Sequence, residues 1–337
     1  MKRNLESATI AEEFSQKIAE QNKKDKIIKM APVIILVFLL LIFSFTVQGF
    51  FTAFNFVSLL RQASILLILA MGITFVIVMG GIDLSVDGVM GLTASVISLL
   101  VLNNITTFDL GIFGVLIVIC IGAFMGFVSG LIHVKLKLPS FIVTFGMSSV
   151  ATGIALLAYK GIPATIQDRP MQDVLESVFL GIPSITWISL LIFVVAYIIQ
   201  EFTGLGRYIF AIGDNENTLK VSGINIDRVK ILAFSWAGLC TGIAGIIGAF
   251  RYGRGEILVG KGMVFPVITA VVVGGTSLSG GKGGVVNSLV GVLIVTVLQN
   301  ALILLGVNPY IQYAIQGIII VAAVSLSVTR NRKIITK

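Results

Sequence analysis

Two carboxylates beside an apolar run are the first residues of this chain whose types and spacing could do chemistry. Asp83 and Asp87 follow a run that is long enough to enter a membrane. A carboxylate at the centre of a span costs about 3 kcal/mol on insertion scales, so such residues are usually functional or interfacial. They could bind a coupling cation or gate a pathway. Alternatively, Asp83 could cap the next helix by accepting its first free N–H groups, and we favour this interpretation.

The sequence contains no complete phosphate-binding loop. Such a loop reads G-x-x-x-x-G-K-[ST], because glycine amides cradle the phosphates and the hydroxyl holds Mg²⁺. The nearest candidate ends in Gly281-Lys282, but Thr276 replaces its first glycine and Gly283 replaces its hydroxyl residue. We therefore expect a non-catalytic chain, with any ATP hydrolysis on a separate subunit.

The two cysteines do not predict a metal site or a cofactor. Cys120 and Cys240 lie inside apolar runs, where cysteine behaves as a small packing residue. A disulfide or a metal site would need partners that the sequence does not offer. We expect neither metal nor cofactor in this chain.

The elements that must position these residues are membrane-spanning helices. The chain is 56% hydrophobic and only 12% charged, whereas soluble domains contain about 25% charged residues. The apolar residues come in blocks near the length of a span, which takes about 20 residues. Strands of a membrane barrel would instead alternate apolar and polar residues. The sequence predicts an all-α integral membrane protein.

About ten spans fit the apolar blocks and define a membrane domain at residues 31–328. The eighth block is only ten residues long, so it must be tilted, broken or extended by the glycine-rich stretch after it. The approximate ends of the ten are 31–49, 57–79, 84–102, 110–133, 139–158, 184–200, 230–250, 264–273, 285–305 and 310–328.

The basic residues indicate the orientation of the chain. With the N-terminus in the cytoplasm, eighteen Lys and Arg residues fall inside and five outside, and Arg61 lies near the outer end of a span. Because cytoplasmic loops carry the excess of positive charge, we expect cytoplasmic tails at residues 1–30 and 329–337. The net charge of +8 is explained by these loops and not by nucleic acid binding.

Two glycine-rich segments suggest an internal repeat. Gly80 and Gly81 begin GGIDLS after Ile-Val-Met, and Gly274 and Gly275 begin GGTSLS after three valines. Transporters commonly carry two repeats whose broken helices meet near the middle of the bilayer, so these glycines are candidate hinges. Span counting puts both segments on the same side, whereas an inverted repeat would separate them unless one dips into the membrane. The two possibilities stay open.

Four motifs of the chain resemble the ribose-type permease subunits of ABC sugar importers. They are GGIDLSV at 80–86, IGDNE at 212–216 with VSGIN at 221–225, GGTSLSGGKG at 274–283 and GVNPYIQY at 306–313. The resemblance runs from about residue 57 to 328. Two positions depart from it: Asp87 stands where the family usually has glycine, and VFP at 264–266 stands where it often has an acidic stretch.

The resemblance implies a permease subunit for a monosaccharide in the bacterial inner membrane, with ribose or another pentose first and a galactose-type hexose second. It also implies an ABC ATPase, a periplasmic or lipid-anchored sugar-binding protein, and a second permease copy or a paralogue. Two alternatives stay open. One is an ion-gradient-coupled carrier or channel, and the other is the same machine with a nucleoside, a branched-chain amino acid or a signalling sugar as cargo.

The longest internal loop, residues 201–230, is the candidate contact with the ATPase. Asp or Asn can begin a helix and Gly can end one, which predicts about two helical turns near residues 214–223. In the resembled family this element docks in a cleft on the ATPase; a solvated connector is the alternative. The candidate coupling residues are Asp214, Glu216, Leu219, Lys220, Val221, Ser222 and Gly223, with Leu219 and Val221 as the apolar contact.

A neutral sugar needs hydrogen-bonding side chains and aromatic faces along its path. Polar residues inside spans also bond across helices for about 0.6 kcal/mol each, so helix packing is the alternative. The candidate path residues are Gln62, Thr74, Asp83, Thr144, Ser148, Phe265, Gln299 and Asn300. We favour Gln299 and Asn300 above the others. On the outer side, Arg251, Arg254 and Lys261 are candidates for docking the sugar-binding protein, since complementary charge speeds association; an ordinary solvated loop is the alternative.

Overall fold

The computed structural model describes residues 30–331 and is almost entirely helical. The expected tails at 1–30 and 329–337 therefore lie largely outside the described residues. The helices are Met30–Thr46, α2 (Ala53–Val78), α3 (Val86–Leu100), α4 (Gly111–Leu136), α5 (Ser140–Tyr159), α6 (Arg169–Glu176), α7 (Ser184–Phe202), α8 (Gly204–Val221), α9 (Ile226–Tyr252), the 3₁₀ helix η1 (Ile257–Val259), α10 (Val264–Val273), α11 (Val285–Leu304) and α12 (Pro309–Asn331).

Six of these helices are long and apolar enough to cross a membrane, namely α2, α4, α5, α7, α9 and α11. The described part of the chain also has four shorter apolar helices, at Met30–Thr46, Val86–Leu100, Ile257–Val273 and Tyr310–Ala322. Together they coincide with the ten predicted spans. The prediction of an all-α, multi-pass membrane protein is confirmed, while the number of crossings stays a prediction.

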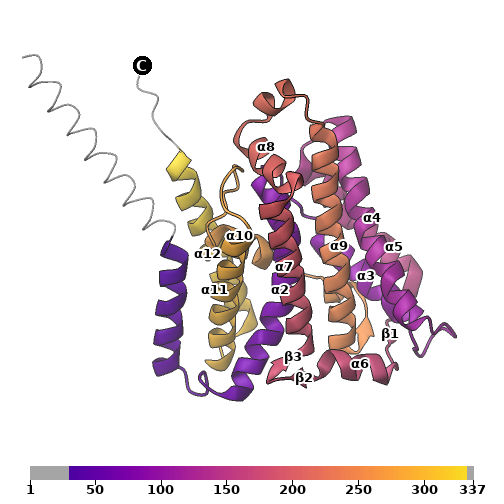
Figure 1. Cartoon of the computed structure of the whole chain (residues 1–337). Helices are drawn as coiled ribbons and strands as arrows, with labels where there is room; N and C mark the ends of the chain where they lie inside the picture. The colour runs from indigo at the N-terminus through magenta and orange to yellow at the C-terminus, as the bar shows by residue number, and fades with distance from the viewer. Residues whose placement is uncertain (1–29, 332–337) are drawn as a thin grey trace, which may run out of the picture.

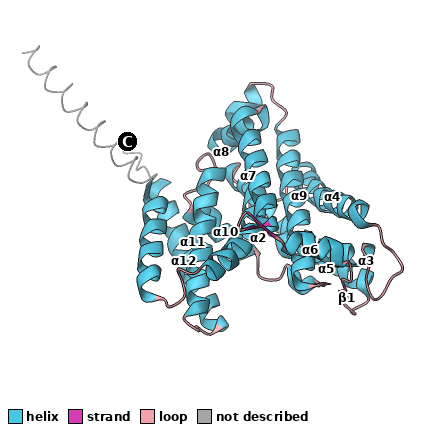
Figure 2. Ribbon diagram, turned by 60° about the horizontal axis from the view of Figure 1, so that its bottom comes forward, coloured by secondary structure: helices cyan, strands magenta, loops and turns pink. Residues whose placement is uncertain are grey.

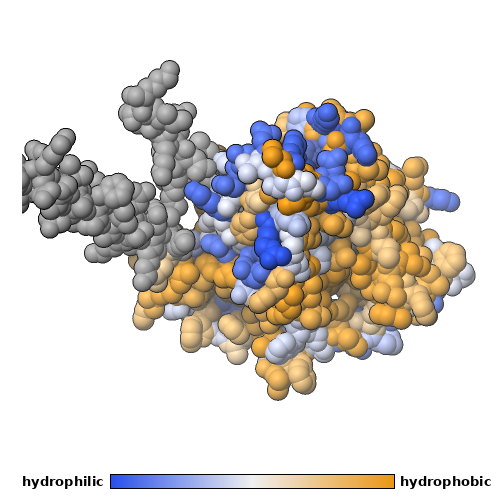
Figure 3. Space-filling model, turned by 45° about the horizontal axis from the view of Figure 1, so that its top comes forward, coloured by the Kyte–Doolittle hydropathy of each residue, from blue (hydrophilic) through white to orange (hydrophobic). Residues whose placement is uncertain are grey.

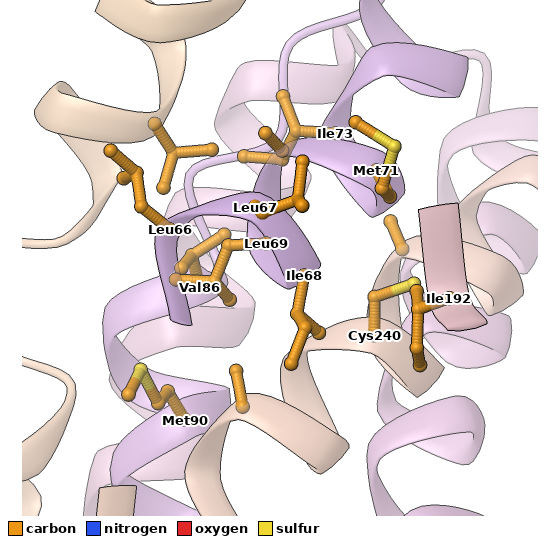
Figure 4. Close-up of a cluster of buried hydrophobic side chains, with 14 of the residues drawn as sticks. Leu66, Leu67, Ile68, Leu69, Met71, Ile73, Val86, Met90, Ile192 and Cys240 are labelled. Carbon is orange, nitrogen blue, oxygen red and sulfur yellow. The ribbon is translucent and has the colours of Figure 1, made fainter. Parts of the chain in front are cut away.

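Helix α2 is the centre of the bundle. Protein surrounds it on all sides, with 89% of its apolar window buried, which fits a helix that is hydrophobic around its whole circumference. Its side chains pack against α3, α7 and α9, as Figure 4 shows for Leu66, Ile68 and Met71 beside Val86, Ile192 and Cys240. By contrast, only 33%, 28% and 28% of the apolar windows of α4, α5 and α7 are buried, and exposed apolar side chains of these helices lie on the flanks of the molecule.

Glycines allow α4 and α9 to pack backbone to backbone. Gly122, Gly126 and Gly130 repeat at every fourth position of α4, and Gly238 and Gly242 face them from α9. A Cβ built on Gly126 would collide with the carbonyl oxygen of Phe234 in α9. Small residues at this spacing commonly form the contacts between membrane helices. The hydrophobic effect does not drive helices together inside a bilayer, so their association depends on the van der Waals attraction that close approach allows.

The two ends of the bundle differ. At the end opposite α8 lie α6 and two short antiparallel pairings, β1 (Ala164–Thr165) with β4 (Arg254–Gly255), and β2 (Val178–Phe179) with β3 (Ile182–Pro183) (Figures 1 and 2). Hydrophilic residues gather at the α8 end, while the flanks below it are largely hydrophobic (Figure 3). This pattern is typical of a bundle whose sides face lipid.

We predict that the substitution Gly126→Val destabilises the protein, because the added side chain forces α4 and α9 apart at a backbone contact. Overpacking of this kind costs about 1–3 kcal/mol, so thermal unfolding in detergent should occur several degrees lower. The matched control is Gly146→Val on α5, where a Cβ meets nothing within 4 Å. Equal unfolding temperatures for the two variants would contradict the assigned packing.

Candidate functional site

The two glycine-rich segments end their helices in the same way. At the end of α2, the amides of Gly80 and Gly81 donate to the carbonyls of Ile77 and Val76 at 2.9 Å each. At the end of α10, the amides of Gly275 and Thr276 donate to Val272 and Val271 at 2.9 and 3.1 Å. Gly80 and Gly275 adopt positive φ angles of 81° and 109°, as this C-terminal motif requires.

These two segments also touch each other, beside α8. The Gly281 amide donates to the Val78 carbonyl at 2.8 Å, and Gly213 of α8 lies against both groups so closely that a Cβ there would collide with them. The candidate hinge glycines therefore lie at one end of the bundle, as span counting predicts, and not at opposite ends. The sequence analysis missed Gly213 as the third member of this contact.

Three hydroxyls on one face of α5 hold the extended segment between α2 and α3 and the first turn of α3. Ser140, Thr144 and Ser148 recur every four residues, and they accept the backbone N–H groups of Ile82, Leu84 and Gly88 at 2.9, 2.9 and 3.1 Å. The hydroxyls of Thr144 and Ser148 thus bond this segment within the chain. Whether they also face the path stays a prediction.

The two carboxylates have different partners. Asp83 is buried and accepts the N–H and the hydroxyl of Ser85 at 2.8 and 2.6 Å. It closes a local turn before α3 and accepts no hydrogen bond from the N–H groups of α3 itself, so the prediction that Asp83 caps α3 is wrong. The reason is that the Asp83 carboxylate bonds to Ser85, the residue just before the helix, and not to the N–H groups of the helix itself.

Asp87 instead caps α10, which is distant in sequence. Its two carboxylate oxygens accept the N–H groups of Gly262 and Val264 at 2.8 Å each. An anionic group at the start of a helix satisfies free amides and complements the helix dipole. The two departures from the family pattern, Asp87 and the 264–266 stretch, therefore meet in space.

The segment before α10 runs inward along α3. Gly255 packs against Ala94 and Ser98, Ile257 against Gly91, and Gly260 against Asp87. From Ser98 to Asp87 this path covers eleven residues of helix, or about 16 Å at 1.5 Å per residue. The apolar stretch Ile257–Val273 is thus interrupted before α10. This interruption favours a broken eighth span that includes the residues before α10, over one extended by the glycine-rich stretch after it, but that this stretch crosses the membrane stays a prediction.

The remaining candidate path residues are spread over the bundle. Thr74 is buried and lies 2.6 Å from the hydroxyl of Ser288, and Gln62 donates to Ser58 at 3.4 Å. Asn300 pairs reciprocally with Asn55, with two hydrogen bonds of 2.9 Å, which ties α11 to α2. The Gln299 amide makes no hydrogen bond with the described residues. Phe265 is 61% exposed.

Helix α8 breaks at Asn215, as the loop composition predicts. Asn215 has non-helical angles, and its side chain accepts the N–H groups of Asn217 and Thr218 at 3.1 and 3.3 Å. A short helix follows and ends before Gly223, whose φ is 74°. The predicted helix of about two turns, begun by Asn and ended by Gly, is confirmed.

The coupling residues of this short helix divide between inward and outward positions. Leu219 packs in part on the core, whereas Val221 is 91% exposed. Glu216 bonds to Lys220 at 3.1 Å and to Lys230 of α9 at 2.8 Å. Partial burial raises the pKa of Glu216, but the hydrogen bonds and charges of Lys230 and Lys220 outweigh it, and the net pKa is lowered. The link to Lys230 was missed by the sequence analysis.

An open cleft of about 450 Å³ lies beside α8. It is lined by Gln200, Glu201, Arg207, Phe210, Ala211, Asp214 and Gly281. Asp214 is therefore a cleft residue, while Ser222 and Gly223 are exposed at the far end of the short helix. The cleft and the exposed Val221 both lie on the end where the glycine-rich segments meet.

The candidate docking residues do not form one patch. Arg251 donates to the carbonyl of Arg61 at 3.3 Å, and Arg254 pairs with Glu256 at 2.8 Å. Lys261 is exposed, but it follows Gly260, which packs against Asp87. It therefore lies about 16 Å further inward than Arg254 by the rise of α3.

Comparison with known proteins places the chain in a family of permeases. A family model described as the permease component of a branched-chain amino acid transport system matches residues 55–324. The ribose import permease protein of Haemophilus influenzae is 38% identical over 88% of this chain and 92% of its own length. That of Bacillus subtilis is 36% identical over 88% and 92%.

An L-arabinose ABC transporter permease protein of Azospirillum brasilense is 33% identical over 86% of this chain and 85% of its own length. No solved structure matches the chain. The family match and the relatives each cover most of the chain. The chain belongs to the family of transport-system permease components that includes the ribose import permeases.

Proposed function

We propose that the chain is the permease subunit of an ATP-driven importer of a monosaccharide, with ribose or another pentose as the first candidate cargo. The observation that carries the proposal is the identity of 36–38% to ribose permeases over about nine tenths of both chains. A galactose-type hexose is the second candidate. The family description names branched-chain amino acids, but the relatives reported above are named for sugars.

The partners follow from this function. An ABC ATPase subunit would hydrolyse ATP, and a sugar-binding protein would deliver the cargo to the outer side. A second copy of this chain or a paralogue would complete the path. Of the three candidate docking residues, Arg254, with its side chain 59% exposed beside Glu256, is the most available, because Arg251 bonds the backbone of Arg61 and Lys261 lies further inward.

The chain would lie in the bacterial inner membrane with ten crossings and both termini in the cytoplasm. The excess of basic residues on the α8 side supports this orientation. Arg207, Lys220 and Lys230 of the described residues fall on that side, where the cleft beside α8 opens. This end would then face the ATPase.

Within the path, Gln62, Thr74, Gln299 and Asn300 remain proposed cargo contacts, and the glycine contact of the α2 and α10 ends is the proposed hinge. Gln299 is the most available of the four, because it alone makes no hydrogen bond with the described residues while it is half-buried. Asn300 already pairs with Asn55, so its use by cargo would require that pair to open.

The proposed function is tested by uptake into proteoliposomes. The chain is reconstituted with a candidate ABC ATPase and a candidate sugar-binding protein from the same organism, and entry of radiolabelled ribose is measured with and without internal ATP. We expect uptake that requires ATP and both partners. Ribose uptake by the chain alone, driven by an ion gradient, would favour a secondary carrier instead. ATP-dependent uptake of a nucleoside or a branched-chain amino acid, with no sugar uptake, would reject the cargo assignment.

We predict that Val221→Asp prevents co-purification of the ATPase, because it puts a charge on the one strongly exposed apolar side chain of the short helix. Loss of an apolar contact and burial of an unpaired charge together cost several kcal/mol, so the recovered ATPase should fall at least tenfold. The control is Val178→Asp, an exposed valine at the opposite end. Equal ATPase recovery for both variants would exclude this docking site.

A further inference from the structure

Lys261 lies at a depth where a charged side chain needs water or a partner. The adjacent Gly262 donates its N–H to Asp87 at 2.8 Å, and Gly88, next to Asp87, donates to Ser148 of α5 at 3.1 Å. Ser148 is eight residues after the start of α5 and eleven before its end. These separations are about 12 and 16 Å of helix, so Lys261 lies near the middle of a span.

The side chain at this depth is not used by the fold. Lys261 is exposed and makes no ion pair with the described residues. The nearby Asp87 carboxylate is already bonded to the N–H groups of Gly262 and Val264. A lysine at the centre of a bilayer costs about 3 kcal/mol or more if it faces lipid, and both surfaces are too distant for snorkelling.

Phe265, four residues after Lys261 and in the first turn of α10, is a second exposed side chain of this region. It is 61% exposed, while all other residues of α10 from Val264 to Val272 are buried. Lys261 and Phe265 thus lie where the segment that runs inward along α3, residues 255–260, ends and α10 begins. An ammonium group donates hydrogen bonds to oxygen acceptors, and an aromatic face packs on apolar C–H surfaces. A hydroxyl-rich cargo offers both kinds of group.

We propose that Lys261 and Phe265 line the water-filled path at its middle, and that Lys261 is a specificity-determining residue that hydrogen-bonds the oxygen atoms of the cargo and disfavours cations. The proposal rests on the proposed function for the identity of the cargo, but the position of these two side chains on the surface of the single chain does not depend on it.

The location is tested by cysteine accessibility in membrane vesicles that contain the complete transporter. Lys261→Cys and Phe265→Cys are compared with Phe124→Cys, which is 60% exposed at the middle of the apolar flank of α4. The native Cys120, exposed on α4, and the buried Cys240 set the background. A charged, membrane-impermeant methanethiosulfonate should label positions 261 and 265 at least tenfold faster than position 124. Labelling as slow as at position 124 would overturn the proposal.

The contact with cargo is tested by transport. We expect Lys261→Met to lower ribose uptake at least tenfold, Lys261→Arg to keep most of it, and added ribose to slow labelling of Lys261→Cys. Thermal unfolding should be unchanged in all three variants, because the side chain is exposed. Normal ribose uptake by Lys261→Met would overturn the assigned role. If the unmodified transporter takes up no sugar, the proposed function is wrong. The difference in labelling rate between positions 261 and 124 still tests the location of Lys261, because that measurement does not require transport.

Discussion

The constraint on which this structure depends is that backbone N–H groups away from water must find acceptors. A continuous helix meets this constraint by itself, but the segments before α3 and before α10 do not, because both are unwound inside the bundle. The acceptors come from elsewhere in the fold. Ser140 and Thr144 of α5 hold the first segment and Ser148 the first turn of α3 after it, and Asp87 holds the second segment.

These bonds connect the middle of the bundle to the end that would face the ATPase. Asp87 fixes the start of α10, and ten residues later α10 ends in the glycine-rich segment that contacts Val78 and Gly213. Gly213 lies in α8, just before the kink at Asn215. A displacement of the short helix would therefore reach α2 and α10 through direct backbone contact, with no flexible side chain between them.

The sequence was sufficient for features that depend on local composition. The apolar blocks located the apolar helices, and Asn215 and Gly223 bounded the short helix, because capping and hydrophobicity act over neighbouring residues. Features that depend on distant partners could not be predicted. Nothing near Asn300 points to Asn55, nothing near Asp87 points to Gly262, and Lys261 was assigned to the outer side because span counting cannot show that a segment turns inward.

The most direct test of this account is to measure the stability and the transport activity of the Asp87→Ala variant, with Asp87→Asn as the comparison variant. Alanine leaves the Gly262 and Val264 amides without an acceptor, at about 1–3 kcal/mol for each group, whereas asparagine keeps one side-chain oxygen. The account predicts a clearly lower unfolding temperature and little uptake for Asp87→Ala, with an intermediate result for Asp87→Asn. Unfolding and uptake of Asp87→Ala equal to those of the unmodified protein would contradict it.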